Sequence, residues 1–125
     1  MIEGIVNGFL EAVVSLPVRG PDGREQLVDA VIDTGYSGTL TLPPTLVAEL
    51  ELPYVIRSRS ALADGTVVAF NVHGATVVWD GRPRYIDIDA VGVAPLLGMS
   101  MLEGHDLHVR VNDGGRVAIQ PAEGS

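Results

Sequence analysis

Turn-forming residues interrupt this chain at short intervals, and that feature limits the folds open to it. The 125-residue sequence contains 15 Gly and 8 Pro, which are spread between short apolar runs. Gly tolerates positive φ and Pro fixes φ, so both residues punctuate regular structure. Short apolar runs between turns are typical of strands rather than of long helices. The pattern therefore predicts an all-β protein.

Alternation of apolar and less apolar residues marks the first strands. Val14, Leu16 and Val18 are separated by single less apolar residues. A period of two is the pattern of a half-buried strand. Residues 21–23, Pro-Asp-Gly, form a turn signal, and residues 27–32 read as a second strand. The sequence therefore predicts a hairpin in the first quarter of the chain.

Only two short segments are candidate helices. Pro43 and Pro44 precede residues 45–50, and Pro is tolerated at a helix start. Residues 99–103 form the second candidate, which Gly104 ends. Further strands are expected within residues 39–42, 66–79, 85–91 and 107–119, the last range folding back as a hairpin. We expect an all-β sandwich or barrel with one or two short helices.

The dipeptide Asp64-Gly65 is the strongest hairpin signal in the sequence. Strand-like segments flank it on both sides. Within the second segment, Gly74 predicts a bulge or bend. Trp79 closes that segment, and we interpret it as an edge or surface anchor. A long hairpin is therefore expected in the middle of the chain.

Composition and charge exclude several classes of protein. Eight basic and 16 acidic residues give a net charge of −8, which would repel nucleic acid. The absence of cysteine excludes disulfides and thiolate chemistry and fits a reducing compartment. The N-terminal residues show no signal peptide, and no apolar run is long enough for a bilayer. We expect a soluble, cytoplasmic protein with neither a membrane nor a nucleic-acid partner.

Acidic residues and histidines offer little sign of a metal site. His105 and His108 lie three apart, so on a strand their side chains would point to opposite faces, and no third ligand is evident. Asp87 and Asp89 share one face of a strand, which we interpret as solvated rather than as a calcium site. No metal and no cofactor are expected.

The tripeptide Asp33-Thr34-Gly35 is the main candidate for chemistry. It follows the apolar-rich residues 28–32, and an Asp at the end of a buried strand is costly unless it is hydrogen-bonded or functional. Gly35 allows a sharp turn that leaves backbone amides free to support the carboxylate. A lone tripeptide of this kind also arises by chance, with Asp merely capping a turn. Its context must decide between the two.

Three segments in order resemble the clan AA, or retropepsin-like, aspartic peptidases. Residues 31–40, VIDTGYSGTL, resemble the active-site loop of that family, and residues 95–102, PLLGMSML, resemble its second signature. Residues 62–67, LADGTV, lie where such enzymes carry the flap hairpin. The resemblance is closest to small single-domain bacterial and archaeal members and to the eukaryotic DNA-damage-inducible domains, and it extends to the retroviral members. The resemblance implies one retropepsin-like domain over residues 1–125, folded as an acid-protease barrel.

The resemblance implies an aspartic endopeptidase that works as a homodimer. Such enzymes use two carboxylates that share one proton, one acting as base toward water and the other as acid toward the carbonyl oxygen. The sequence has one Asp-Thr-Gly, so a second copy must supply the other carboxylate. By resemblance, Asp33 is catalytic, Thr34 bonds across the dimer and Gly35 permits the tight loop. The flap residues would be Ala63, Asp64, Gly65 and Thr66, which close over a peptide or protein substrate.

The sequence departs from the family pattern at several positions, including one beside Asp33, and two alternative functions stay open. Tyr36 stands where many members have Ala or Ser, which makes the cleft wall beside Asp33 bulkier. A catalytically weak retropepsin-like dimer that acts as a peptide-binding or assembly module is the first alternative, because a fold does not guarantee its usual activity. The second is an unrelated small β-barrel that binds a small ligand. The oligomeric state and the separation of the two Asp33 carboxylates would discriminate between these functions.

Overall fold

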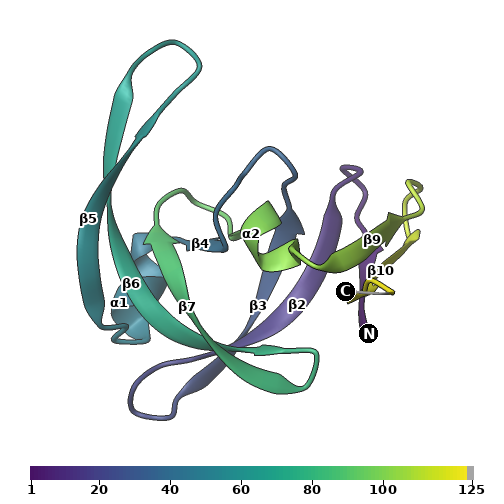
Figure 1. Cartoon of the computed structure of the whole chain (residues 1–125), viewed down its shortest axis with the longest axis horizontal. Helices are drawn as coiled ribbons and strands as arrows, with labels where there is room; N and C mark the ends of the chain where they lie inside the picture. Colours follow the sequence, from purple (N-terminus) through teal and green to yellow (C-terminus); the bar gives the residue numbers. More distant parts are fainter. Residues whose placement is uncertain (124–125) are drawn as a thin grey trace.

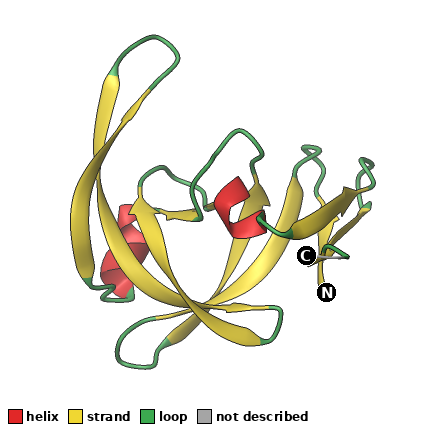
Figure 2. Cartoon of the chain, viewed as in Figure 1, coloured by secondary structure: helices red, strands yellow, loops and turns green. Residues whose placement is uncertain are grey.

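The computed structural model describes residues 1–123, and strands dominate it (Figures 1 and 2). Strand residues make up 54% and helical residues 8%, which confirms the predicted all-β class. In chain order the elements are β1 (Ile2–Val6), β2 (Ala12–Arg19), β3 (Glu25–Ile32), β4 (Leu40–Leu42), α1 (Pro44–Glu49), β5 (Tyr54–Ala61), β6 (Val67–Trp79), β7 (Arg82–Ala90), β8 (Leu96–Leu97), α2 (Met99–Leu102), β9 (His105–Val109) and β10 (Arg116–Pro121).

The two helices lie where the sequence predicted them. α1 begins at Pro44, one residue earlier than expected, and α2 ends at Leu102, one residue earlier than expected. Neither helix exceeds two turns, because Pro43 and Gly98 delimit their starts and the chain turns back into strands directly afterwards. Among residues 1–123 there is no helix with the length and apolar character needed to cross a membrane.

All strands belong to one sheet that closes on itself. The order of pairing is β5-β6-β7-β4-β8-β3-β2-β1-β10-β9, and β6 also pairs with β2. The additional pairing joins β6, β7, β4, β8, β3 and β2 into a closed circuit, as the predicted barrel requires. β5 lies outside this circuit on β6, while β1, β10 and β9 extend it from β2.

Most of the core comes from the strands of the closed circuit, and both helices, β1 and β10 add to it. In β2, Val14, Leu16 and Val18 are buried, so the alternation in the sequence predicted the inward face correctly. Each fully buried aliphatic side chain of this size contributes about 1.5–3 kcal/mol relative to an exposed one. All three residues of β4 are buried, and the strand lies between β7 and β8.

Two parallel ladders hold the centre of the barrel together. β3 pairs with β8, with Val31 opposite Leu96, and β4 pairs with β7, with Leu40 opposite Ile88. β4 and β8 then pair with each other in antiparallel fashion. This arrangement places the residues after β3 directly beside the start of α2.

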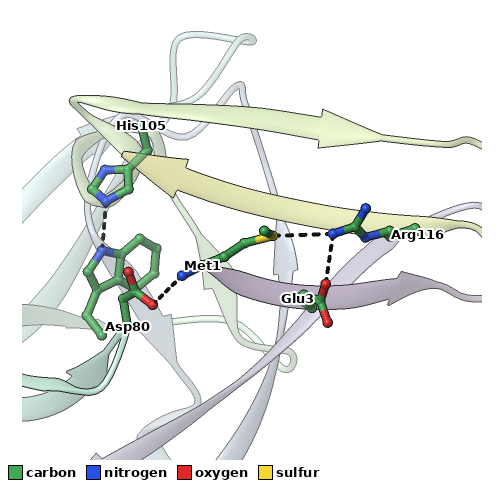
Figure 3. Close-up of polar contacts among 6 residues, drawn as sticks. Met1, Glu3, Asp80, His105 and Arg116 are labelled. Carbon is green, nitrogen blue, oxygen red and sulfur yellow. Dashed lines mark hydrogen bonds and ion pairs between the residues drawn. The ribbon is translucent and has the colours of Figure 1, made fainter. Parts of the chain in front are cut away.

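The N-terminal strand β1, which the sequence did not predict, pairs with both β10 and β2. Figure 3 shows its polar contacts: the Met1 ammonium lies 2.7 Å from Asp80, and Arg116 donates to Glu3 at 2.8 Å. Gly4 interrupts the apolar pattern of residues 2–6, so this pattern did not indicate a strand. Glycine is required there because a Cβ would collide with the backbone carbonyl of Val13.

The interpretation of Trp79 as a surface anchor is wrong. Trp79 is 6% exposed and belongs to the core. Its indole N–H donates to His105 Nε2 at 3.3 Å, and the two rings meet edge to face with centroids 5.5 Å apart (Figure 3). The pairing with His105 gives the indole nitrogen a partner inside the protein, so the ring can be buried.

The bulge predicted at Gly74 lies in the neighbouring strand instead. β6 runs unbroken through Gly74, which pairs with Asp87 in regular register. The irregularity lies instead in β5, between Tyr54 and Ile56. A Cβ at Gly74 would meet the end of the exposed Tyr85 side chain, which would have to move aside.

Candidate active site

The Asp33 loop begins where β3 ends, and backbone hydrogen bonds hold it in a tight turn. The Asp33 amide donates to the Leu97 carbonyl of β8 at 2.9 Å. The Gly35 amide donates to Asp33 Oδ1 at 2.9 Å, and the Tyr36 amide donates to the Asp33 carbonyl at 3.1 Å. The first of these bonds fixes the loop to the barrel, and the second orients the carboxylate.

The start of α2 holds the other end of the same loop. The Met99 amide donates to the Tyr36 carbonyl at 2.8 Å, and the Ser100 amide donates to the Gly38 carbonyl at 3.1 Å. Helix starts leave amides without partners inside the helix, and the loop carbonyls satisfy these two. The two segments that resembled family signatures are therefore joined through their backbones.

A groove of about 560 Å³ lies beside the Asp33 loop. Its walls come from that loop, from the β5–β6 hairpin and from the segment between β7 and β8. The lining residues are Asp33, Gly35, Tyr36, Ser37, Gly38, Thr41, Arg59, Ser60, Leu62, Val68, Phe70, Asp89, Val91 and Leu96. The volume is within the range of ligand-binding clefts, roughly 300–1,000 Å³.

The groove does not include every residue that the sequence singled out. Asp33 and Gly35 line it, whereas Thr34 is exposed and lines a separate, smaller pocket with residues of α2 and β9. Ala63, Asp64, Gly65 and Thr66 are all exposed at the tip of the long hairpin and do not line the groove. Their neighbour Leu62 does line it. The hairpin thus faces the groove through its arms.

The hairpin tip has the turn that Asp64-Gly65 predicted. Thr66 donates to Asp64 Oδ1 through its amide at 2.9 Å and through its hydroxyl at 2.6 Å. The hydroxyl, followed by the amide, holds the pKa of Asp64 below its usual value. Gly65 has φ +87°, a conformation that favours glycine. The β5–β6 hairpin rises well beyond the barrel (Figure 1).

A second carboxylate in the groove was missed by the sequence analysis. Asp89 is half-buried, and its Oδ2 accepts a hydrogen bond from the Tyr36 hydroxyl at 2.6 Å. Asp87 is exposed, as we expected for both residues. The interpretation of the two as one solvated face is therefore wrong for Asp89. Burial, followed by the hydrogen bond and the charge of Asp89, raises the pKa of Tyr36 above its ordinary value. No local signal pairs these residues, because they meet only through the tertiary fold.

The described residues offer no evident metal centre. Among residues 1–123 no group of three or more His, Asp or Glu side chains is arranged to hold a metal ion. Both ring nitrogens of His105 are engaged, since Nε2 accepts the Trp79 indole and Nδ1 lies 3.0 Å from the Glu103 carbonyl. His108 is exposed on the opposite face of β9.

The closed barrel, the Asp33 loop joined to α2 and the long hairpin define the retropepsin-like fold. Solved structures of two aspartic proteases are among those that share it. A retropepsin-like aspartic protease from Rickettsia conorii is 17% identical over 97% of this chain and 90% of its own, with a TM-score of 0.59. The EIAV protease complexed with the inhibitor HBY-793 is 14% identical over 74% of this chain and 86% of its own, with a TM-score of 0.55. No protein-family model and no curated protein sequence matches the chain.

Proposed function

We propose that this protein is an aspartic endopeptidase that hydrolyses peptide bonds as a homodimer. The observation that carries the proposal is the position of Asp33, on the wall of an open groove that faces a long hairpin. An Asp that only capped a turn would have no need of such a groove. The likeness of the fold to two aspartic proteases supports the same chemistry.

The chemistry requires a second Asp33 from another copy of the chain. One carboxylate takes a proton from water, and the other, protonated, donates to the carbonyl oxygen of the scissile bond. In each copy, the Gly35 amide would hold one carboxylate oxygen in place. Two like charges at close range are unfavourable, so the pair would share one proton.

The surface beside Asp33 supports a partner copy at that position. Thr34 is exposed and, within the described part of the chain, its side chain makes no hydrogen bond. Its hydroxyl is thus available to a second subunit next to the two carboxylates. A two-fold axis there would bring together two grooves and two hairpins around one dyad.

The substrate would be an extended peptide or protein segment. Clefts of this kind bind strand-like segments through backbone hydrogen bonds and accommodate alternate side chains in pockets. The arms of the β5–β6 hairpin line the groove through Arg59, Leu62 and Phe70. In this proposal the tip residues 63–66 close over the bound segment.

Replacement of Asp33 by Asn tests the proposal. Asn Oδ1 can still accept the Gly35 amide, so the loop should keep its shape, but an amide cannot take a proton from water. Cleavage of a mixed peptide pool, followed by mass spectrometry, should fall by about 10²–10⁴-fold or more. Circular dichroism and sedimentation of the variant serve as controls for fold and assembly. An Asp33→Asn protein that still cleaves at the wild-type rate would contradict the proposed role of Asp33.

A further inference from the structure

The groove holds a carboxylate that the proposed hydrolysis does not use. Asp89 lies in β7 opposite Thr41 of β4, and its side chain lines the same groove as Asp33. Its Oδ2 accepts the Tyr36 hydroxyl at 2.6 Å. Within residues 1–123 this is the only hydrogen bond to the Asp89 carboxylate, which takes part in no ion pair there.

The second oxygen of Asp89 is accessible to solvent. No buried side-chain nitrogen or oxygen among the described residues lacks a hydrogen-bond partner. Because Asp89 Oδ1 has no partner, it is not one of the buried atoms and must be reachable from solvent. A carboxylate oxygen has two lone pairs. Asp89 Oδ1 is therefore free to accept hydrogen bonds from a bound molecule.

Tyr36 holds Asp89 without cancelling its charge. A Cβ on Gly38 would lie 2.5 Å from Tyr36 Cζ, and one on Gly98 would lie 2.6 Å from Tyr36 Cδ2. Glycine at both positions leaves room for the ring, which lies directly against the backbone. Since burial and Asp89 raise the pKa of Tyr36, the phenol stays a neutral donor. It orients the carboxylate and leaves the negative charge in place.

The surfaces around the two polar groups are apolar. Leu62, Val68 and Phe70 line the groove from the hairpin side, and Val91 and Leu96 line it from the barrel side. A side chain that matches both features has an apolar stem and a charged end that donates hydrogen bonds. Lysine and arginine have this character. A wholly apolar side chain would displace water from Asp89 and offer no donor in exchange.

We propose that Tyr36 and Asp89 form a subsite of the groove that selects a lysine or arginine side chain of the bound peptide. The inference rests on one part of the proposed function, namely that a peptide binds in the groove. The net charge of −8 adds a weak long-range attraction for basic peptides. Arg59 also lines the groove, but in the described residues it forms no ion pair with Asp89 and does not neutralise it.

Cleavage of matched peptides tests the subsite. Cleavage products of a mixed peptide pool should show one position near the scissile bond that is enriched in Lys and Arg. In a peptide pair that differs only there, Lys should exceed norleucine, which has a similar stem but no ammonium, by about tenfold or more in kcat/KM. Asp89→Asn should remove this preference. Asp87→Asn removes the same charge from an exposed position on the same strand and should retain it.

Binding separates failure of the subsite from failure of the hydrolysis. The same two peptides are titrated by calorimetry into Asp33→Asn protein, with and without Asp89→Asn. Tighter binding of the Lys peptide that depends on Asp89 supports the subsite, even if the wild type cleaves nothing and the proposed hydrolysis fails. Cleavage without a basic preference overturns the subsite alone. Equal binding of the two peptides, or binding of neither, also overturns it, provided that circular dichroism shows folded variants.

Discussion

Tyr36 shapes the groove beside Asp33 and orients the Asp89 carboxylate in it. Its ring lies against Gly38 and Gly98, where any Cβ would collide with it, and its hydroxyl reaches Asp89 at 2.6 Å. A small residue at this position would leave the ring space empty and Asp89 without its donor. Tyr36 replaces the Ala or Ser expected from the family resemblance, and Gly38, Gly98 and Asp89 accommodate its larger side chain.

The pH response of Tyr36 tests this contact. Because its pKa is raised on folding, the folded state keeps a proton that the unfolded chain loses. Its contribution to stability is therefore complete below about pH 10 and is lost as pH rises above that value. From about pH 8 to about pH 11, folded wild type and folded Tyr36→Phe should gain equal tyrosinate absorbance.

Unfolding in urea provides the control for that titration. In the unfolded state the wild type should gain one more tyrosinate than Tyr36→Phe over the same range. If the folded wild type already gains more than the folded variant, Tyr36 ionises readily, and the bond to Asp89 does not protect it.

The candidate site was predictable only where its residues are local in sequence. Asp33, Thr34 and Gly35 are adjacent, and the turn they form depends on their own backbone. Asp89 is different, because only the pairing of β7 with β4 brings it to the groove. Its sequence neighbours predict an amphipathic strand, and nothing local distinguishes it from the exposed Asp87.

Among the elements, β5 and the tip of the β5–β6 hairpin have little support from the rest of the molecule. Residues 54–57 and 59–61 of β5 are exposed, and β5 pairs only with β6. Strands with few buried contacts open more readily than core strands. β2, in contrast, pairs with β1, β3 and β6.

The rate of amide hydrogen exchange should therefore differ between the hairpin and the barrel strands. Amides of β5 and of the first half of β6 should exchange at least about tenfold faster than those of β2 and β3. Addition of a peptide substrate to the Asp33→Asn protein should slow exchange in the hairpin while leaving β9 and β10 unchanged. Mass spectrometry of peptic fragments measures both effects. Uniform protection across β2 and β5, or a hairpin indifferent to peptide, would contradict a mobile flap.

Elements with local alternation were predictable, and elements shaped by distant contacts were not. β2 and β3 followed from their own pattern. β1 did not, because Gly4 is set by the approach of Val13 from the next strand. Likewise, the indole N–H of Trp79 suggested a surface position. In the fold that N–H donates to His105, which the sequence did not predict.

At the scale of the whole molecule, one Asp-Thr-Gly per chain makes assembly a condition of the proposed activity. Wild-type and Asp33→Asn chains that are mixed equally and refolded together should pair at random. About a quarter of the dimers would then hold two Asp33 residues. Cleavage should fall to about half of that given by the same amount of wild type refolded alone.

If the monomer were active, the mixing experiment would give a different cleavage rate. Added Asp33→Asn chains would then leave the cleavage rate of the wild type unchanged. Sedimentation of the same mixtures at micromolar concentrations reports whether dimers form at all. A fully active mixture without dimers would contradict the shared site.

The two parallel ladders at the centre of the barrel also determine at what stage of folding the groove can form. Val31 pairs with Leu96 and Leu40 pairs with Ile88, so strands from opposite halves of the chain must meet. Such encounters are slow, because long loops lose entropy before their contacts compensate for it. A nascent chain on the ribosome displays Asp33 long before it has β8 or α2 to hold the loop. The Asp33 loop therefore reaches its folded geometry only after β8 and α2 have been made.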